Sequence, residues 1–338
     1  MENAVVFGIG KKFFELESII RSEYKIVAII DNDQNKNGVF YKGIEIISPN
    51  KMKEFDFEKI LITSMYEVEI IQQLLKMGIE KNRIIPYYPK SRIRNTQLIS
   101  INDDGSIHAK FNTIKFNLIN ASDSCIMNEV FFRGIYCLHS YEKECIVIDI
   151  GMNVGLSTLF FASYHNVKYV YSFEPFTETY GQALANIKLN DKKFVNKIKH
   201  FNFALSNYNG KQSFRYNKKL PGSMRIEDGS HPCSISHEDS SSIEIKEAGL
   251  IIKDILEKHK DMRIIMKVDC EGSEYKIFKS LEQYQLIDKI NILMMETHDG
   301  REAEIEFYLN KYHFTYFKNC SNGEEKLGMI YAASKGNH

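Results

Sequence analysis

The stretch CIVIDIGMNVGLSTLFFASYHNVKYVYSFEP, residues 145–175, decides the fold of this chain. It opens with an unbroken, largely β-branched apolar run, as expected of a strand that is buried on both faces of a parallel sheet. A tight turn containing Gly151 and Gly155 follows, and then come a predicted helix over 156–164 and a second predicted strand over 169–173. The stretch therefore predicts a β-α-β unit of a Rossmann-like α/β sheet.

Two acidic residues stand at the carboxyl ends of these predicted strands. Asp149 precedes the glycine turn, and Glu174, followed by Pro175, ends the second strand. The turn offers backbone N–H groups and a helix amino end to a polar ligand, while Glu174 suits the two hydroxyls of a ribose. Unlike the dinucleotide fingerprint, an acid ahead of the turn suits a ligand with a cationic amino group and no phosphate, such as S-adenosylmethionine. The alternative is an ordinary β-α-β unit with an exposed glutamate.

Two later segments also end apolar runs in charged side chains. They are IIMKVDCEGSE at residues 264–274, with Lys267, Asp269, Glu271 and Glu274, and ILMMETHD at residues 292–299, with Glu296 and His298. With these motifs the chain resembles the FkbM family of S-adenosylmethionine-dependent methyltransferases. The resemblance spans about residues 115–300 and rests on Asp149, Gly151, Asn153, Gly155, Glu174, Pro175, Asn190, the block from Lys267 to Glu274, Glu296 and His298.

The resemblance implies a class I methyltransferase sheet with helices on both faces, an acceptor with a hydroxyl group, and S-adenosylmethionine as cofactor. Cys270 stands where valine or isoleucine is usual in the family, which we interpret as an apolar exchange. The implied cofactor-binding residues are Asp149, Gly151, Asn153 and Gly155 for the methionine part, Glu174 and Pro175 for the ribose, and Ala204 for the adenine edge.

Methyl transfer to a hydroxyl needs a group that receives the acceptor's proton. Asp269, at the carboxyl end of a predicted strand, is the expected base, and His298 at the next strand end is its rival. Lys267 is expected to hold the neighbouring carboxylates ionised. The alternative is that the carboxylates, Glu274 above all, are paired structural groups. A candidate oxygen-rich nest for Mg²⁺ uses three of the side chains, Asp269, Glu271 and Glu296.

The length of 338 residues predicts two domains. We expect a smaller Rossmann-like accessory domain over 1–88, a linker, hairpin and prelude over 89–140, and the methyltransferase domain over 141–338. Within the middle segment, alternating apolar residues over 97–118 predict short strands, and a helix is expected over 126–136. Two polar residues of that helix either reach the mouth of the active site or, as we favour, complete a helix surface: Glu129 and Tyr136.

The first 88 residues carry a second nucleotide-like pattern. Gly8-x-Gly10 follows a predicted strand, and Asp31 stands at the end of the next one. Phe13 replaces the third glycine of the dinucleotide fingerprint, and its bulk is expected to separate helix from strand or to close the phosphate groove. The segment resembles Rossmann-like domains appended to sugar-modifying enzymes. We favour a structural or partner-docking role, and a nucleotide or nucleotide-sugar site and an NAD site remain as alternatives.

Composition narrows the class of protein. The chain has 44 acidic and 44 basic residues, which disfavours nucleic acid and anionic membranes as partners. Six scattered cysteines, without a Cys-x-x-Cys pair, predict reduced thiols in a cytoplasmic protein. No apolar run approaches a membrane span, and the amino terminus lacks the basic start of a signal peptide. The polar segment 216–242 predicts a substrate lid, with disorder as the alternative.

These features together predict an O-methyltransferase for a sugar, a nucleotide-sugar or a precursor of surface polysaccharide. An NAD-dependent sugar oxidoreductase or epimerase that uses Gly8, Gly10 and Asp31 is the first alternative, although residues 1–88 lack the Tyr-x-x-x-Lys pair that such enzymes often use near their cofactor. A non-catalytic nucleotide-binding scaffold is the second alternative, and it leaves three acids at separate strand ends without a function. The acceptor, the choice between oxygen and nitrogen, and a homo-oligomeric state stay open.

Overall fold

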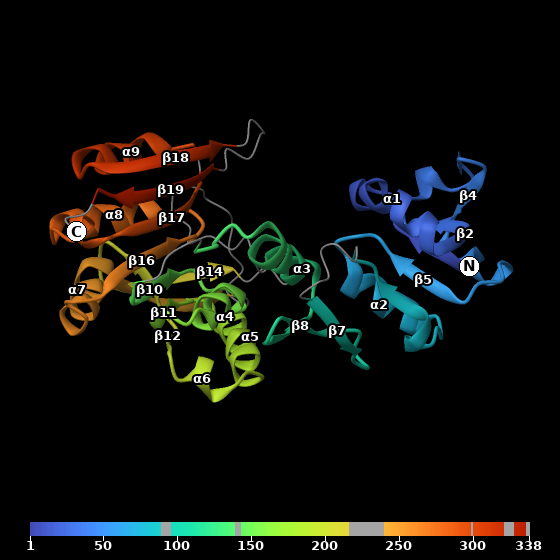
Figure 1. Cartoon of the computed structure of the whole chain (residues 1–338), viewed down its shortest axis with the longest axis horizontal. Helices are drawn as coiled ribbons and strands as arrows, with labels where there is room; N and C mark the ends of the chain where they lie inside the picture. The colour runs from blue at the N-terminus through green and yellow to red at the C-terminus, as the bar shows by residue number, and fades with distance from the viewer. Residues whose placement is uncertain (89–95, 139–142, 216–239, 299, 321–327, 336–338) are drawn as a thin grey trace. The chain divides into compact units, whose positions relative to one another are not determined.

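The computed structural model describes residues 1–88, 96–138, 143–215, 240–298, 300–320 and 328–335. The chain divides into two compact units, Met1–Phe132 and Arg133–His338 (Figure 1). Each unit has its own sheet and its own core. The division of the chain at residues 88 and 140 stays a prediction.

The first unit is built on a six-stranded sheet in the order β3-β4-β2-β1-β5-β6. All neighbouring strands pair in parallel except β3 and β4. The strands are β1 (Glu2–Phe7), β2 (Tyr24–Ile30), β3 (Phe40–Tyr41), β4 (Ile44–Ile47), β5 (Lys59–Ile62) and β6 (Ile84–Pro86). The helices are α1 (Lys11–Glu23), α2 (Glu67–Lys76) and the short 3₁₀ turns Gln34–Lys36, Pro49–Glu54 and Lys81–Arg83.

An antiparallel three-stranded sheet and a helical segment complete the first unit. The strands are β7 (Thr96–Ile101), β8 (Ile107–Phe111) and β9 (Ile114–Leu118), as the alternating pattern predicted. The helix, however, begins earlier than expected, because Asn120 caps it by accepting a hydrogen bond from the Asp123 N–H. It runs as α3 (Ala121–Met127) and continues as a π-helical turn over Asn128–Arg133.

The second unit is built on a seven-stranded sheet in the order β12-β11-β10-β16-β17-β19-β18. Its first five strands are parallel, and β19 pairs antiparallel with both β17 and β18 (Figure 1). The strands are β10 (Cys145–Ile150), β11 (Val167–Phe173), β12 (Ile198–Phe201), β16 (Arg263–Val268), β17 (Ile292–Thr297), β18 (Phe314–Cys320) and β19 (Gly328–Ser334). A smaller sheet holds β13 (Ala204–Ser206), β14 (Gly210–Arg215) and β15 (Ser240–Glu247).

Helices connect the parallel strands of the second unit. They are α4 (Leu156–Ser163), α5 (Thr177–Lys188), α6 (Lys192–Val195), α7 (Ala248–Lys258), α8 (Glu274–Gln283), α9 (Glu302–Lys311) and a 3₁₀ turn at Ile287–Lys289. All six residues of β10 are buried, as the apolar run predicted for a central strand. The predicted lid over 216–242 lies outside the described residues except for 240–242, which begin β15.

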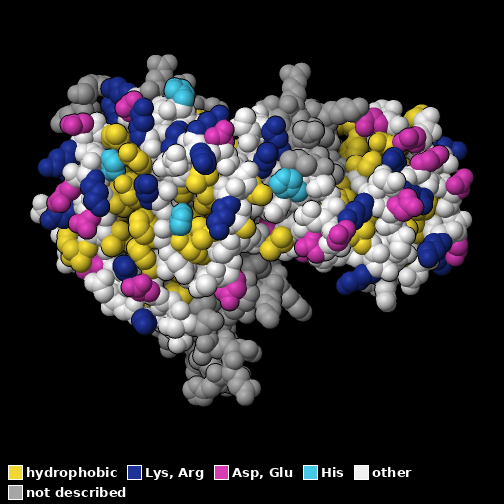
Figure 2. All heavy atoms as spheres, turned by 90° about the horizontal axis from the view of Figure 1, so that it is seen from below, with side chains coloured by type: hydrophobic (Ala, Val, Ile, Leu, Met, Phe, Trp, Pro, Cys, Tyr) yellow, Lys and Arg dark blue, Asp and Glu magenta, His cyan; other side chains and the backbone are white. Residues whose placement is uncertain are grey.

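The surface charges, the helices and the cysteines can be compared with what the composition predicted. On the face shown in Figure 2, Lys and Arg are interspersed with Asp and Glu. Among the described residues, no helix combines the length and apolar character that a membrane crossing requires. Four cysteines of the described residues carry free thiols: Cys125, Cys137, Cys145 and Cys270.

Candidate functional site

The glycine turn after β10 adopts the backbone that its residues predicted. Gly151, Asn153 and Gly155 have φ angles of +82°, +50° and +85°, the left-handed region that glycine and asparagine tolerate best. The close approach at Gly151, however, is to protein: a Cβ there would lie 1.8 Å from the carbonyl oxygen of Asp269. At Gly155 a Cβ would lie 3.2 Å from the Cβ of Ala183. The turn is therefore locked between β16 and α5.

Asp149 lies beneath this turn and is fully buried. Its Oδ2 accepts hydrogen bonds from Ser157 Oγ at 2.9 Å and Thr158 Oγ1 at 2.6 Å, and its Oδ1 lies 3.3 Å from Lys267 Nζ. Sequence reasoning missed Ser157 and Thr158. Their position in the first turn of the helix after the glycines was the available signal, since such side chains face back toward the strand end. The structure thus gives Asp149 a bracing position, and its contact with a cofactor stays a prediction.

Lys267 joins the two central strands of the second unit. It stands opposite Asp149 in the register of β10 and β16, and it is fully buried. Its Nζ donates to the carbonyls of Ile150 and Gly151 and lies 3.7 Å from Asp269 Oδ2. Burial by itself would lower the pKa of this ammonium group, but Asp149 and Asp269 outweigh it and raise the pKa. Lys267 is therefore charged at neutral pH and lies beside the carboxylates of Asp149 and Asp269; its expected effect on the ionisation of neighbouring carboxylates stays a prediction.

Glu174 ends β11 and is buried, with 5% of its surface exposed. Its Oε2 accepts the Asn153 N–H and its Oε1 accepts the Phe176 N–H, both at 3.0 Å. Burial raises the pKa of this carboxyl to about 7, although the two N–H groups oppose the shift. Each oxygen keeps a further lone pair that can accept a hydroxyl. The geometry therefore has the acceptors that a ribose diol needs.

Asp269 follows β16 and is more accessible, with 29% of its side chain exposed. Tyr136 donates a hydrogen bond to its Oδ2 at 3.2 Å, and Lys267 Nζ lies 5.5 Å from the centre of the Tyr136 ring. This contact corrects our favoured interpretation of Tyr136 as a residue that completes a helix surface. Glu129, the other residue of that expectation, belongs to the first unit, so its role stays a prediction.

Glu274 and His298 form a second buried group beside the Asp269 turn. His298 Nδ1 lies 2.8 Å from Glu274 Oε1, and its Nε2 lies 3.5 Å from Glu271 Oε2. Burial lowers the pKa of the His298 imidazole, but the two glutamates and Asp269 raise it further, to about 9. Glu274 also accepts the N–H groups of Cys270 and Gly272. His298 is therefore protonated at neutral pH and fastens the turn that carries Glu271, whose φ of +56° is strained for a non-glycine residue.

The remaining predicted residues lie near this edge or along it. Ala204 begins β13 and packs with Phe176, Ile243 and Ile245 in a small apolar cluster. Pro175 is half-buried, and its carbonyl accepts Asn202 Nδ2 at 3.1 Å. Asn190 donates to the Asn186 carbonyl at the end of α5. Asn186 itself, which sequence reasoning missed, donates to the Val154 carbonyl within the glycine turn.

The predicted magnesium nest is not supported. Within the described ranges of the chain, no three His, Cys, Asp or Glu side chains are arranged to hold a metal ion. Glu296 is half-buried at the end of β17, and Glu271 is paired with His298. The three carboxylates Asp269, Glu271 and Glu296 therefore do not converge as a metal site in the part of the chain that the structure describes.

The strand ends that carry these groups meet at one place in the sheet. The chain passes from β10 to β11 on one side and returns at β16 on the other, so the carboxyl ends of β10 and β16 form the topological switch point of the sheet. Asp149 is the last residue but one of β10, and Glu174 and Asp269 directly follow β11 and β16. The seven-stranded order with a reversed β19 and this acidic edge define a class I methyltransferase fold.

Comparison with known proteins gives the family. The sequence model of the methyltransferase FkbM domain matches residues 149–321, more than half of the chain. The chain belongs to this family of methyltransferases, as the motifs indicated. A second sequence model, described as C2185-like, N-terminal, matches residues 1–85.

Individual relatives are distant. Methyltransferase 1 of Beauveria bassiana (strain ARSEF 2860) is 21% identical over 187 residues, which cover 51% of this chain and 73% of the relative. Among solved structures, M. jannaschii TYW2 in complex with AdoMet is 12% identical and covers 68% of this chain and 84% of its own, with a TM-score of 0.37. UDP-D-quinovosamine 4-dehydrogenase from Vibrio fischeri is 23% identical over 23% of this chain and 74% of its own, with a TM-score of 0.21.

Proposed function

We propose that this methyltransferase uses S-adenosylmethionine to methylate a hydroxyl group of a sugar, a nucleotide-sugar or a glycan precursor, with Asp269 as the base. The observation that carries the proposal is the difference between Asp269 and its neighbours. Asp149, Glu174 and Glu274 are buried beneath the edge of the sheet, whereas Asp269 is partly exposed beside the glycine turn. Asp269 is thus the carboxylate at this switch point that is placed to meet an acceptor.

The side chains at the edge fit a nucleoside without phosphates. Glu174 offers two carboxylate oxygens for ribose hydroxyls, and the apolar cluster around Ala204 offers a surface for a base. The cation nearest the turn, Lys267, is buried and paired with Asp149 and Asp269, so it is not offered to a phosphate. S-adenosylmethionine has the adenosine and lacks the phosphates, and when bound it supplies a methyl group that is activated by its attachment to a sulfonium.

The residues of the chain then have three tasks. Glu174 and the turn from Gly151 to Gly155 would fix the donor, and the buried Asp149–Lys267 pair would keep that turn in place. Asp269 Oδ would receive the proton that the acceptor hydroxyl loses as its oxygen bonds to carbon. Tyr136 and Lys267 both contact Asp269 Oδ2 and would orient this carboxylate before the reaction. His298 is the weaker candidate for this task, because a group with a pKa of about 9 already carries its proton at pH 7.

A carboxylate base such as Asp269 is suited to the methylation of a hydroxyl group. A hydroxyl keeps its proton until the new bond forms and therefore gains from a neighbouring carboxylate. The resemblance to the family supports a hydroxylated acceptor, and the balanced charge of the chain supports a small-molecule or glycan partner over a nucleic acid. A cytoplasmic location would give the enzyme access to such precursors.

Asp269→Asn tests the base. We expect kcat to fall by a factor of about 10² to 10⁴ while the KM for S-adenosylmethionine changes little, because the substitution removes proton acceptance but keeps the shape. The assay is mass-spectrometric detection of methylated products over a panel of sugars and nucleotide-sugars. The matched control is Asp261→Asn, a change of the same kind at an exposed position. Full activity of Asp269→Asn would remove Asp269 from the mechanism.

Calorimetric titration tests the cofactor. S-adenosylhomocysteine should bind the wild type and bind Glu174→Ala more weakly, by the roughly 1 to 3 kcal/mol that lost hydrogen bonds to a charged group cost. NAD is titrated in parallel. Binding of NAD without binding of S-adenosylhomocysteine would transfer the function to the first unit and to the oxidoreductase alternative.

A further inference from the structure

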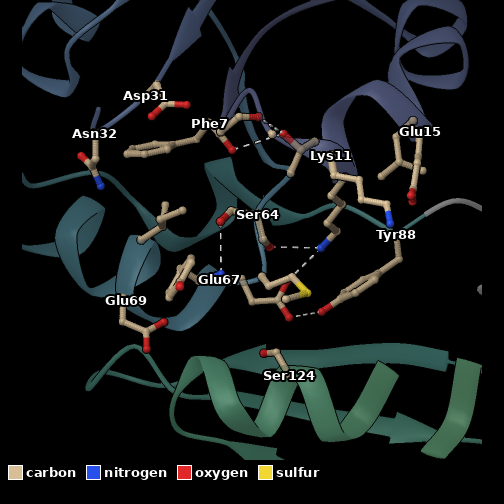
Figure 3. Close-up of a pocket in the computed structure, with 18 of the residues that line it drawn as sticks. Phe7, Lys11, Glu15, Asp31, Asn32, Ser64, Glu67, Glu69, Tyr88 and Ser124 are labelled. Atoms are coloured by element: carbon tan, nitrogen blue, oxygen red, sulfur yellow. Dashed lines mark hydrogen bonds and ion pairs between the residues drawn. The ribbon is translucent and has the colours of Figure 1, made fainter. Parts of the chain in front are cut away.

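The first unit contains a cavity of about 700 Å³ at the carboxyl ends of its central strands (Figure 3). The chain leaves β1 toward β2 on one side, and β5 pairs with β1 on the other, so the cavity lies at the topological switch point of this sheet. Ligands of open α/β sheets bind at such points. The volume lies within the range of about 300 to 1,000 Å³ that is typical of small-molecule sites.

The backbone after β1 leaves one side of this cavity open. Gly8 has a φ of +100° and packs against Ser64, so its conformation and its neighbour both require glycine. Gly10 has an ordinary φ of −116°, and a Cβ there would meet no protein atom within 4 Å. Gly10 is the N-cap of α1, a position that accepts glycine, and the missing side chain leaves room for a ligand in the cavity that Gly10 lines. The amino end of the 13-residue helix α1 begins directly after it, where backbone N–H groups and the helix dipole favour an anion.

Phe13, at the position of the missing third glycine, does not obstruct this side. It is fully buried and packs in the core of the sheet with Val6 and Ile29. It does not line the cavity. Of the two effects expected of its bulk, closure of the phosphate groove is wrong, because the ring packs in the core; separation of helix from strand stays a prediction. Lys11 lines the cavity instead, and in the described structure it has no carboxylate partner.

An acidic residue stands at the adjacent strand end. Asp31 accepts the N–H groups of Ile9 and Asp33, at 3.1 and 2.9 Å, and pairs with Lys36 at 2.9 Å. These donors hold it ionised beside the glycine loop. A carboxylate in this position accepts both hydroxyls of a ribose and repels a 2′-phosphate.

The opposite end of the cavity is rich in groups that bind hydroxyls. Ser124 projects from α3 toward Glu67 and Tyr88 (Figure 3). It is 5% exposed, and its Oγ has no hydrogen-bond partner among the described residues. A buried hydroxyl without a partner costs free energy unless a ligand supplies the bond. Glu69, which also lines the cavity, accepts the Ala121 N–H and so ties α3 to α2 across this wall.

The lining favours a ligand with few negative charges, because it holds four carboxylates, Glu15, Asp31, Glu67 and Glu69, and three lysines. Lys12 is neutralised by Glu67 at 3.2 Å and Lys36 by Asp31, which leaves Lys11 as the unpaired lysine of the described lining. The carboxylates offer acceptors to several hydroxyls, while the end of α1 and Lys11 suit a short phosphate group. A ribose, a diphosphate and a polyhydroxylated group fit these three parts in order.

We propose that the cavity binds a nucleoside-diphosphate sugar, with the ribose at Asp31, the diphosphate at Gly10 and Lys11, and the sugar at Ser124. The site is separate from the methyltransferase site and does not depend on the function proposed for it. The diphosphate lies across Gly10, which explains why no side chain is present there. A dinucleotide shares the ribose and the diphosphate, and the choice of probes separates the two.

Calorimetric titration of the full chain tests the site with UDP-glucose, ADP-glucose, UDP and NAD as probes. We expect at least one of the two sugar nucleotides to bind more tightly than NAD. Gly10→Val should weaken that binding at least tenfold, because its side chain fills the phosphate position while Val tolerates the extended backbone. Gly181→Val is the matched control, since a Cβ at Gly181 also meets nothing within 4 Å and lies in the other unit. It should bind like the wild type.

Ser124→Ala provides a second variant, because its hydroxyl makes no bond that the fold would lose. It should weaken the sugar nucleotide about fivefold and leave UDP or ADP unchanged. The proposal is overturned if neither sugar nucleotide binds, if NAD binds in preference, or if Gly10→Val and Ser124→Ala both bind like the wild type. Circular dichroism confirms folding of each variant, and titration with S-adenosylhomocysteine in the same samples reports separately on the methyltransferase site.

Discussion

The two units have the same arrangement of a glycine turn and an acidic residue at the sheet edge, but the protein around these residues differs. Each places a glycine turn after a central parallel strand and an acid after the neighbouring strand. In the second unit Gly151 is pressed against the Asp269 carbonyl, whereas in the first unit Gly10 faces open space. Protein packing thus requires glycine at position 151, whereas Gly10 leaves space that a ligand can occupy. The role of a glycine in such a motif therefore depends on the atoms around it as well as on its position in the sequence.

The acids differ in the same way. Glu174 is buried, and burial raises its pKa to about 7. For Asp31, burial acts in the same direction, but the N–H groups of Asp33 and Ile9 together with Lys36 prevail and lower its pKa. One acid titrates near neutrality and the other stays ionised, so pH should act on the two units differently.

Alanine at the two glycines gives the largest expected contrast. Gly151→Ala should destabilise the second unit by at least about 5 kcal/mol, because a Cβ meets a backbone oxygen at 1.8 Å in a left-handed conformation. Gly10→Ala should cost about 1 kcal/mol or less. Urea unfolding with hydrogen exchange in peptides of each unit measures both. Equal losses of stability in the two variants would contradict the proposed difference between the two glycines.

The buried ion pair gives the next contrast. Lys267→Met should cost about 3 to 5 kcal/mol, since it leaves Asp149 buried without its cation. Lys36→Met removes the cation beside Asp31 in the first unit, where that lysine is 37% exposed, and should cost about 1 kcal/mol or less. The double variant Lys267→Met with Asp149→Asn should recover part of the loss. No recovery would mean that the lysine acts by packing alone.

Glu174→Gln isolates the titration of the buried acid. The folded-state pKa of about 7 lies above the value of 4.5 for a free glutamate, so the contribution of Glu174 to stability is present below pH 4.5 and is lost as pH rises toward 7. The loss amounts to about 3 kcal/mol. The variant should therefore gain stability relative to the wild type across this window, measured by urea unfolding at stepped pH. Parallel curves would contradict the raised pKa.

Tyr136→Phe gives the smallest expected effect. It removes the donor to Asp269 Oδ2 and should lower kcat about fivefold, a loss of about 1 kcal/mol. Tyr164→Phe, a neighbouring aromatic with its hydroxyl on the Leu138 N–H, serves as the control. An unchanged kcat would leave Tyr136 a packing residue.

Much of the architecture was predictable because it depends on local pattern. The apolar run of β10, the glycine turn and the acids at strand ends all lie within a few residues of one another, and periodicity identifies each element. The family was predictable for the same reason, since its motifs are short and sit at strand ends.

The contacts across the sheet were not predictable. The residues around Gly151 do not predict its contact with the Asp269 carbonyl, and those around Tyr136 do not predict its hydrogen bond to the Asp269 carboxylate. Both contacts join segments more than 100 residues apart. The pairing of Glu274 with His298 also had no local signal. Phe13 was misjudged because a motif specifies spacing and leaves the rotation of the helix open.

The reversed strand has a consequence for synthesis. β18 pairs within the sheet only through β19, and β19 follows it in the chain. As the ribosome extends the chain, β18 emerges before β19, the strand with which it pairs. Until β19 emerges, one edge of β17 is unpaired. This sheet therefore cannot complete its folding until residues 328–334 have left the exit tunnel, and until then β17 has an unpaired edge that is open to wrong pairing.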